Sequence, residues 1–113
     1  MGANSDGDRE ALRMEMSHRL IFKRVAREEY FEAVAWYETQ RSGLGREFAQ
    51  EVDRVLKRAL ANPEQFRKVR PSARKARLDR FPYNIYFAVK GDVFSVLAVF
   101  HGPRHPRELS KRL

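Results

Sequence analysis

The chain has 113 residues and no cysteine. It is long enough for one domain with a modest hydrophobic core, and it excludes disulfides, a thiolate nucleophile and Cys-based metal sites. Lys and Arg number 23 against 15 Asp and Glu, and the formal net charge of +8 favours nucleic acid or an acidic protein as a partner. No stretch approaches the length of a membrane span and no secretory signal is visible, so we expect a cytoplasmic protein with no membrane partner.

The N-terminal part divides into a tail and a first strand. Residues 1–17 show no apolar period and are expected to form a flexible tail. LIFKRV, residues 20–25, is short, apolar and β-branched enough for an edge strand. We therefore place a single domain at residues 18–113.

Two amphipathic helices follow, joined by a short turn. The first has one apolar stripe at helical spacing, formed by Ala26, Tyr30, Ala33, Val34 and Tyr37. Gly43 and Gly45, within RSGLG, supply the backbone freedom that a reversal needs. The second helix ends at Asn62-Pro63, and its stripe contains Phe48, Val52, Val55, Leu56, Ala59 and Leu60. The short connection predicts an antiparallel helical hairpin.

The rest of the chain is predicted to form a three-stranded antiparallel sheet. Residues 73–80 alternate weakly, and residues 80–106 read as a long hairpin with Gly91-Asp92 as a type II′ turn. That turn sets the pairs Tyr83 with Phe100, Ile85 with Ala98, Phe87 with Val96, and Val89 with Phe94. The face they form is wholly apolar, and the helices are expected to cover it. The predicted class is α+β: an N-terminal strand, a helical hairpin and a three-stranded antiparallel sheet packed on the helices.

Some apolar residues lie outside this core. The other face of the hairpin is mixed and includes Tyr86 and Leu97. Such a surface often marks a protein partner, although a curled sheet can also cover it. Phe31 and Trp36 lie on the two flanks of the first helix, either as peripheral core or as partner contacts.

Several phrases of the sequence resemble the RelE/ParE superfamily of bacterial type II toxins. They are the helix AREEYFEAVAWYETQ, the turn GLGREF, the strand FPYNIYFAV with its GD turn, and VLAVFHGPRHP. The order of a strand, a helical hairpin and three strands also resembles the superfamily, over residues 20–107. The resemblance implies the toxin of a toxin–antitoxin (plasmid stabilisation) module, held inactive by a cognate antitoxin that would contact Phe31, Trp36, Tyr86 and Leu97.

The phrasing is closer to ParE-like members, which inhibit DNA gyrase, than to RelE-like members, which cut messenger RNA in the ribosome. The ribonucleases typically carry an Arg early in the strand matching FPYNIYF and an aromatic residue near the C-terminus. This chain has Asn84 at the first site, and Tyr86 is its last tyrosine. RNA cleavage needs a base, a cation for the phosphate and an acid. We therefore predict a protein-binding gyrase inhibitor without catalytic residues.

A cluster of basic residues follows the last predicted strand. If the protein is instead a ribonuclease, imidazoles that titrate near neutral pH would act in a set formed by His101, Arg104, His105 and Arg80. In the preferred interpretation there is no catalysis. A charged surface for the target would then be formed by Arg77, Arg80, His101, Arg104 and Arg107.

A second basic run, residues 67–80, has Asp79 as its only acid. It is either a groove that tracks phosphates or a solvated β edge that discourages aggregation.

The chain has no P-loop, dinucleotide fingerprint, zinc spacing or nucleophile elbow, so we predict no cofactor and no metal. Three hypotheses follow: a gyrase-inhibiting toxin, a ribosome-dependent endoribonuclease, and an inactive basic module that binds antitoxin or RNA.

Overall fold

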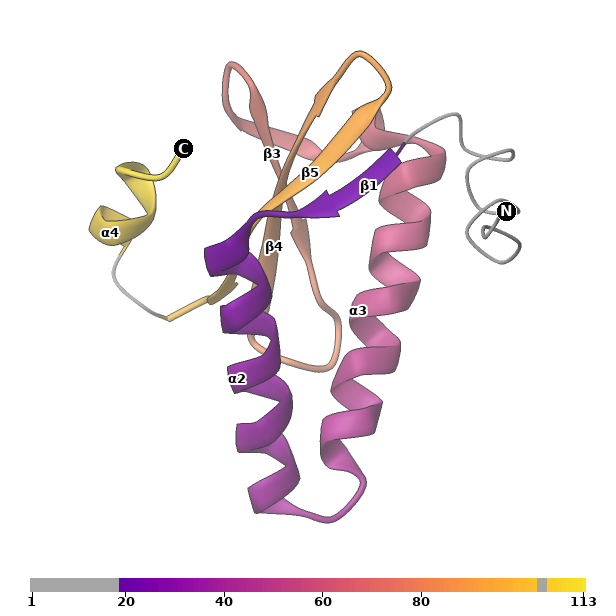
Figure 1. Ribbon diagram of the computed structural model, residues 1–113, viewed down its shortest axis with the longest axis vertical. Coiled ribbons are helices and arrows are strands. Elements are labelled where there is room, and N and C mark those ends of the chain that lie inside the picture. Colours follow the sequence, from indigo (N-terminus) through magenta and orange to yellow (C-terminus); the bar gives the residue numbers. More distant parts are fainter. Residues whose placement is uncertain (1–18, 104–105) are drawn as a thin grey trace.

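A five-stranded mixed sheet with two long helices on one face forms the body of the protein (Figure 1). The computed structural model describes residues 19–103 and 106–113, so the tail expected at residues 1–17 lies outside the described residues. The elements are β1 (Arg19–Phe22), α2 (Arg24–Gln40), α3 (Leu44–Ala61), a 3₁₀ turn (Pro63–Gln65), β2 (Arg67–Arg70), β3 (Ala73–Arg77), β4 (Tyr83–Lys90), β5 (Val93–His101) and α4 (Pro106–Ser110). The predicted α+β class is confirmed, with one more strand than expected.

β1 lies at one edge of the sheet, whose order is β1-β5-β4-β3-β2. It runs parallel to β5, and the pairing ends with Phe22 opposite Val96. We expected this strand at residues 20–25, but Lys23 is already the N-cap of α2. The helical period therefore begins earlier than expected, and β1 covers only the first half of the outer edge of β5.

The predicted apolar stripes of α2 and α3 face the sheet. Their buried members are Ala26, Ala33 and Tyr37 of α2 and Phe48, Val52, Val55, Leu56, Ala59 and Leu60 of α3. The ring of Tyr37 stacks on Phe48 with centroids 5.2 Å apart and meets Phe81 edge-on at 4.8 Å. Aromatic packing next to the β3–β4 loop thus holds the helical hairpin on the sheet. None of the helices in the described residues has the length and apolar composition of a membrane span.

The turn between α2 and α3 is fixed by a carboxylate and two glycines. Gly43 has a φ of 91°, in the left-handed region that favours glycine. The N–H groups of Gly43 and Gly45 each donate to the Glu38 carboxylate at 3.0 Å, and these bonds lower the pKa of Glu38. A Cβ at Gly45 would lie 2.6 Å from the carbonyl oxygen of Val34. The two helices therefore approach so closely that only glycine fits.

The β4–β5 hairpin follows the predicted register only near its turn. Gly91 has a φ of 61°, as its predicted place in the turn requires, and Phe87 pairs with Val96 as predicted. Between Tyr86 and Phe87 the register shifts by one residue, which leaves Leu97 as a bulge. The two expected pairs beyond Phe87 are therefore wrong.

The bulge changes which residues face the helices. We expected Ala98 and Phe100 on the helix-facing side, but they belong to an apolar cluster on the opposite face. Val99 replaces them in the main core, where it is 2 % exposed. Because side chains alternate along a strand, one extra residue exchanges the two faces.

A buried carboxylate holds the loop between β3 and β4. Glu51 of α3 is 1 % exposed, and its Oε2 accepts the backbone N–H groups of Asp79 and Arg80. Arg54 lies 3.6 Å from its other oxygen. We expected the strand to continue to Arg80, but it ends at Arg77. The N–H of Leu78 still donates to the carbonyl oxygen of Tyr83 in β4, whereas those of Asp79 and Arg80 bond to Glu51 of α3.

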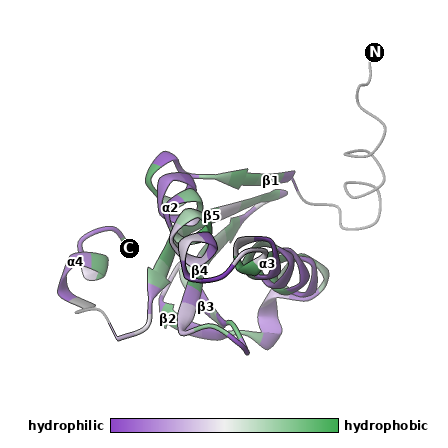
Figure 2. Ribbon diagram, turned by 90° about the horizontal axis from the view of Figure 1, so that it is seen from below, coloured by the Kyte–Doolittle hydropathy of each residue, from purple (hydrophilic) through white to green (hydrophobic). Residues whose placement is uncertain are grey.

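Two elements were not expected from the sequence. β2 contains a single apolar residue, Val69, and α4 is one turn long. They border a second apolar cluster, formed by Tyr86, Ala98, Phe100 and Leu109 with Val69, Leu97 and Leu113. Figure 2 shows α4 on one side of the sheet and α3 on the other. The mixed face of the hairpin is therefore partly covered by the chain itself.

Replacing Gly45 by Ala tests the close approach of the helices. A Gly→Ala change inside a helix normally stabilises a protein, because Ala restricts the unfolded chain. Here the added Cβ would clash with the Val34 carbonyl, and we expect a loss of about 1–3 kcal/mol in the free energy of unfolding. Urea denaturation of the full chain measures it. An increase in stability would contradict the packing.

Candidate functional site

A groove of about 210 Å³ runs between α2 and the part of β5 that β1 leaves uncovered. We call it the α2–β5 groove. It is lined by Glu29, Glu32, Ala33, Trp36, Tyr83, Val99 and His101. The Trp36 side chain is 56 % exposed. The groove therefore combines an accessible indole, two carboxylates and the edge of a strand.

Side chains, and not a strand, satisfy this part of the β5 edge. Among the described strands, none pairs with residues 97–101 on the side away from β4. The N–H of Val99 donates to Glu29 Oε1 at 2.9 Å, and the carbonyl oxygen of Leu97 accepts from Arg112 Nη2 at 2.8 Å. These backbone groups are the ones an added strand would bind, so the edge is protected but remains a possible pairing site.

Arg112 joins the C-terminal segment to α2. Its Nη1 lies 2.6 Å from Glu29 Oε2, and both side chains are largely buried. This pair was not predicted from the sequence. The need for a partner at Glu29 could have been predicted, because Glu29 falls between Ala26 and Ala33 on the apolar side of its helix, where a carboxylate needs a partner. Nothing local marked Arg112.

Two of the predicted partner-binding residues lie in the α2–β5 groove. The His101 ring meets that of Tyr83 edge-on with centroids 5.2 Å apart, and Trp36 lines the same groove. Phe31 is 59 % exposed and packs against Tyr30, but it does not line the groove. The predicted positions of Phe31 and Trp36 off the buried stripe of α2 are therefore observed.

Arg80 is held on the helix side of the sheet. It pairs with Glu47 of α3 at 2.7 Å and lies over the ring of Phe81, 5.3 Å from the ring centroid. Hydrogen bonds from Arg80 and then Arg41 lower the pKa of Glu47. The guanidinium of Arg80 is therefore already engaged with α3.

Arg77 lines a different pocket, of about 330 Å³, together with Lys75, Pro82, Tyr83, Asn84, Gly102 and Pro103. Arg77 pairs with Asn84, and the adjacent pair, Ala76 with Ile85, lies in the main core on the helix side. Because side chains alternate along a strand, the Arg77 side chain faces away from α2 and α3. His101 lies in the groove on the helix side. Among the described residues lining the Arg77 pocket there is no carboxylate or imidazole, so it offers cations for a phosphate but no base.

The other predicted residues are distributed as follows. Arg104 and His105 lie outside the described residues, and Arg107 is exposed at the start of α4. Tyr86 is buried and Leu97 half-buried in the cluster beside α4. In residues 19–103 and 106–113, no group of three or more His, Asp or Glu is placed to hold a metal ion.

Comparison with known proteins supports the fold. No protein-family model matches the sequence, and no curated protein matches it. Among solved structures, the chain is similar to one described as the chromosomal ParDE toxin–antitoxin system from P. aeruginosa. The TM-score is 0.66 and the identity 19 %, over 76 % of this chain and 97 % of the other. The expected RelE/ParE-like fold is thereby confirmed.

Replacing Arg112 by Ala tests how the β5 edge is protected. The change removes the bonds to Glu29 and to the carbonyl oxygen of Leu97, and leaves both acceptors in a largely buried setting. We expect a loss of about 1–3 kcal/mol in the free energy of unfolding, measured with urea. Lys111→Ala, an exposed change in the same segment, serves as the control and should stay within about 0.5 kcal/mol. Equal stability of the two variants would show that the contact contributes nothing.

Proposed function

We propose that this protein is the toxin of a type II toxin–antitoxin module, of the ParE-like kind, and that it acts in the cytoplasm by binding DNA gyrase. The observation that carries the proposal is the fold, which matches a chain of the P. aeruginosa ParDE system over nearly all of that chain. The sequence phrases that resemble ParE-like toxins lie in α2, the α2–α3 turn, β4 and β5.

The antitoxin is proposed to bind in the α2–β5 groove. An extended segment there could pair with residues 97–101 and place an apolar side chain against Trp36. Glu32 is exposed beside it and would accept a basic side chain of the antitoxin. An antitoxin segment that continues across α2 would also contact Phe31, which lies outside the groove.

Tyr86 and Leu97 can take part in antitoxin binding only at a cost. Both belong to the apolar cluster that Leu109 covers from α4. A partner that reaches them has to replace the contacts of the C-terminal segment, including those of Arg112. Their proposed role therefore couples antitoxin binding to the position of this segment.

The target surface is proposed to lie at the end of the sheet where β3 and β5 finish. Arg77 is exposed there, and Arg107 is exposed at the start of α4. Arg80 would contribute only by exchanging its bond to Glu47, and His101 by a contact at the end of the groove. Arg104, which lies between His101 and Arg107 in sequence, is also proposed to contact the target.

Among the described residues of the candidate ribonuclease and target-binding sets, the charged groups lie apart, and this separation supports a proposal without catalysis. Arg80 pairs with α3, His101 packs on Tyr83, and Arg77 faces the other side of the sheet. A ribonuclease of this fold would need a base and a cation on one phosphate. The endoribonuclease and the inactive module remain as outcomes of the experiment.

Supercoiling of relaxed plasmid by gyrase, titrated with the purified protein, tests the target. We expect inhibition, with messenger RNA left intact in a translating extract run in parallel. Arg77→Gln should raise the inhibitory concentration about three- to tenfold, because it removes a contact worth roughly 1 kcal/mol. The control is Arg24→Gln, an exposed change at the start of α2. Cut message with unaffected gyrase would support the ribonuclease, and no effect on either would support the inactive module.

Fluorescence tests the antitoxin site, because Trp36 is the only tryptophan of the chain. Binding of the cognate antitoxin should shift its emission to the blue and protect it from acrylamide. Trp36→Ala should weaken binding by about tenfold or more, as loss of a central aromatic contact does. Val25→Ala, which removes an exposed apolar side chain of α2 that does not line the groove, should have little effect. Unchanged quenching would place the antitoxin elsewhere.

A further inference from the structure

The β2–β3 hairpin places like charges directly opposite one another. Arg67 pairs with Lys75 and Lys68 pairs with Arg74 across the two strands. Opposed like charges destabilise a sheet, because the side chains of such a pair lie only about 5 Å apart at their Cβ atoms. Lys68 and Arg74 face the helix side, whereas Arg67 and Lys75 face the other side, so the cost is present on both faces.

No carboxylate of the described chain neutralises these cations. Every ion pair between residues of the described ranges uses an acid on α2 or α3, namely Glu29, Glu47, Glu51 or Asp53. Arg41, Arg54, Lys57, Arg80 and Arg112 are their partners. The cations of the hairpin are in none of these pairs.

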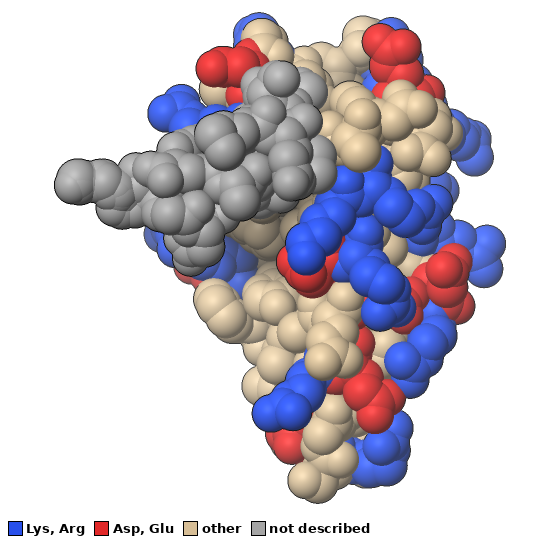
Figure 3. Space-filling view, turned by 90° about the vertical axis from the view of Figure 1, so that its right-hand side faces the viewer, with Lys and Arg blue, Asp and Glu red and all other residues tan. Residues whose placement is uncertain are grey.

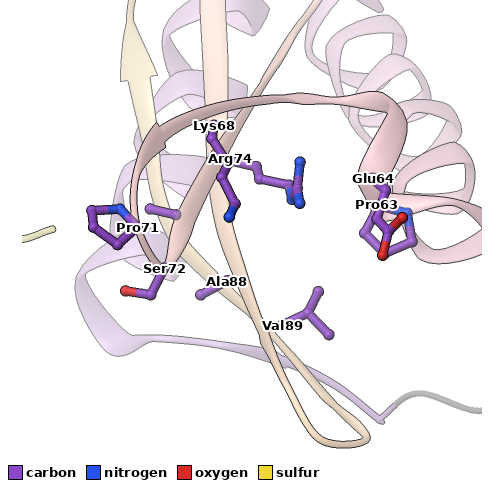
Figure 4. Close-up of a pocket in the computed structure, with 9 residues that line it drawn as sticks. Pro63, Glu64, Lys68, Pro71, Ser72, Arg74, Ala88 and Val89 are labelled. Atoms are coloured by element: carbon purple, nitrogen blue, oxygen red, sulfur yellow. The ribbon is translucent and has the colours of Figure 1, made fainter.

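A pocket of about 280 Å³ lies where this hairpin meets the end of β4, and two of the cations point into it (Figure 4). The Arg74 guanidinium is oriented by a 2.8 Å bond from Nη1 to the carbonyl oxygen of Phe66. Its remaining N–H groups and Lys68 border the pocket. Glu64, the one acid in the lining, belongs with Pro63 to the 3₁₀ turn, which forms one wall of the pocket. The pocket therefore suits a compact oxyanion such as a phosphate.

The surroundings extend the positive surface beyond this pocket. Figure 3 shows Lys and Arg side chains gathered on the side of the molecule that carries α3, with fewer Asp and Glu between them. Arg58 at the end of α3 lies over the ring of Phe66, 5.6 Å from its centroid, next to the start of β2. A ligand held by Lys68 and Arg74 would thus meet further cations on α3.

We propose that the β2–β3 hairpin binds the phosphate backbone of duplex DNA, with Lys68 and Arg74 on one phosphate and Arg67 and Lys75 on the opposite side of the ribbon. The β2–β3 hairpin is the outer edge of the five-stranded sheet, and cations on its two faces can contact phosphates on the two walls of a major groove that receives this edge. Cations on both faces of the hairpin can contact the phosphates on both walls of the groove. An acidic peptide lying on one face would leave the cations of the other face without an anionic partner. Binding is independent of base sequence, because only the backbone is contacted.

This surface is distinct from the groove proposed for the antitoxin. β2 and β1 are the two opposite edges of the sheet. DNA binding by the hairpin therefore does not depend on the proposed function, and it can be measured without gyrase or antitoxin.

Fluorescence anisotropy of a short labelled duplex, titrated with the full chain over a series of salt concentrations, tests the proposal. Each phosphate contact adds about 0.9 to the slope of the logarithm of affinity against the logarithm of salt concentration. Because Lys68 and Arg74 share one phosphate, replacing both by Gln should lower the slope by about 0.9 and the affinity at least tenfold. The control, Arg24→Gln with Arg27→Gln, removes the same charge from exposed positions of α2 and should keep the slope of the parent protein.

A second variant guards against a folding defect, because Arg74 also bonds to Phe66. Arg67→Gln with Lys68→Gln changes two exposed side chains of the edge strand, and it should also reduce the slope, with a urea midpoint no lower than that of the parent protein because two pairs of like charges are removed. Equal losses in the hairpin and control variants would overturn the proposal, since net charge alone would then explain binding. Preference for single-stranded RNA over the duplex would also overturn it.

Discussion

The buried carboxylate of Glu51 is the constraint on which the arrangement of the other elements depends. A carboxylate that is 1 % exposed is costly unless hydrogen bonds satisfy it, and here Oε2 accepts two backbone N–H groups of the β3–β4 loop. This contact ties α3 to the loop and so places Phe81 against Tyr37 and Phe48. The aromatic cluster in turn sets the distance between the helical hairpin and the sheet, and with it the width of the α2–β5 groove.

The charges of the molecule are divided between its two edges. Near β1 and α2, acids are available and the strand edge is satisfied by Glu29 and Arg112. At the β2 edge the cations face each other without acids between them. These opposed cations of β2 and β3 thus lie at the other edge of the sheet from the groove that we assign to the antitoxin. A neutralising partner and a polyanion could therefore occupy the protein at the same time, on surfaces with different chemistry.

Sequence patterns predicted what depends on local spacing. The helical stripes, the glycine turn and the pairing next to Gly91 follow from periods of a few residues. The bulge at Leu97 was not predictable in this way, because a turn sets the register only as far as the first irregularity. The Glu29–Arg112 pair joins residues 83 positions apart, and β2 lacks any apolar alternation. Among the residues predicted from the sequence to bind partners, only Trp36 and His101 line the groove, and its strand edge depends on tertiary contacts.

The parallel pairing of β1 with β5 also determines when the fold can be completed. The first strand of the described chain has its partner at residues 93–96, after all the other strands. During synthesis, residues 19–22 are made before residues 93–96, so β1 cannot pair with β5 until nearly the whole domain has been synthesised. The helical hairpin can form in the meantime, since its contacts are local. A nascent chain therefore has no finished sheet until β5 has been synthesised, and the α2–β5 groove can be assembled only after that.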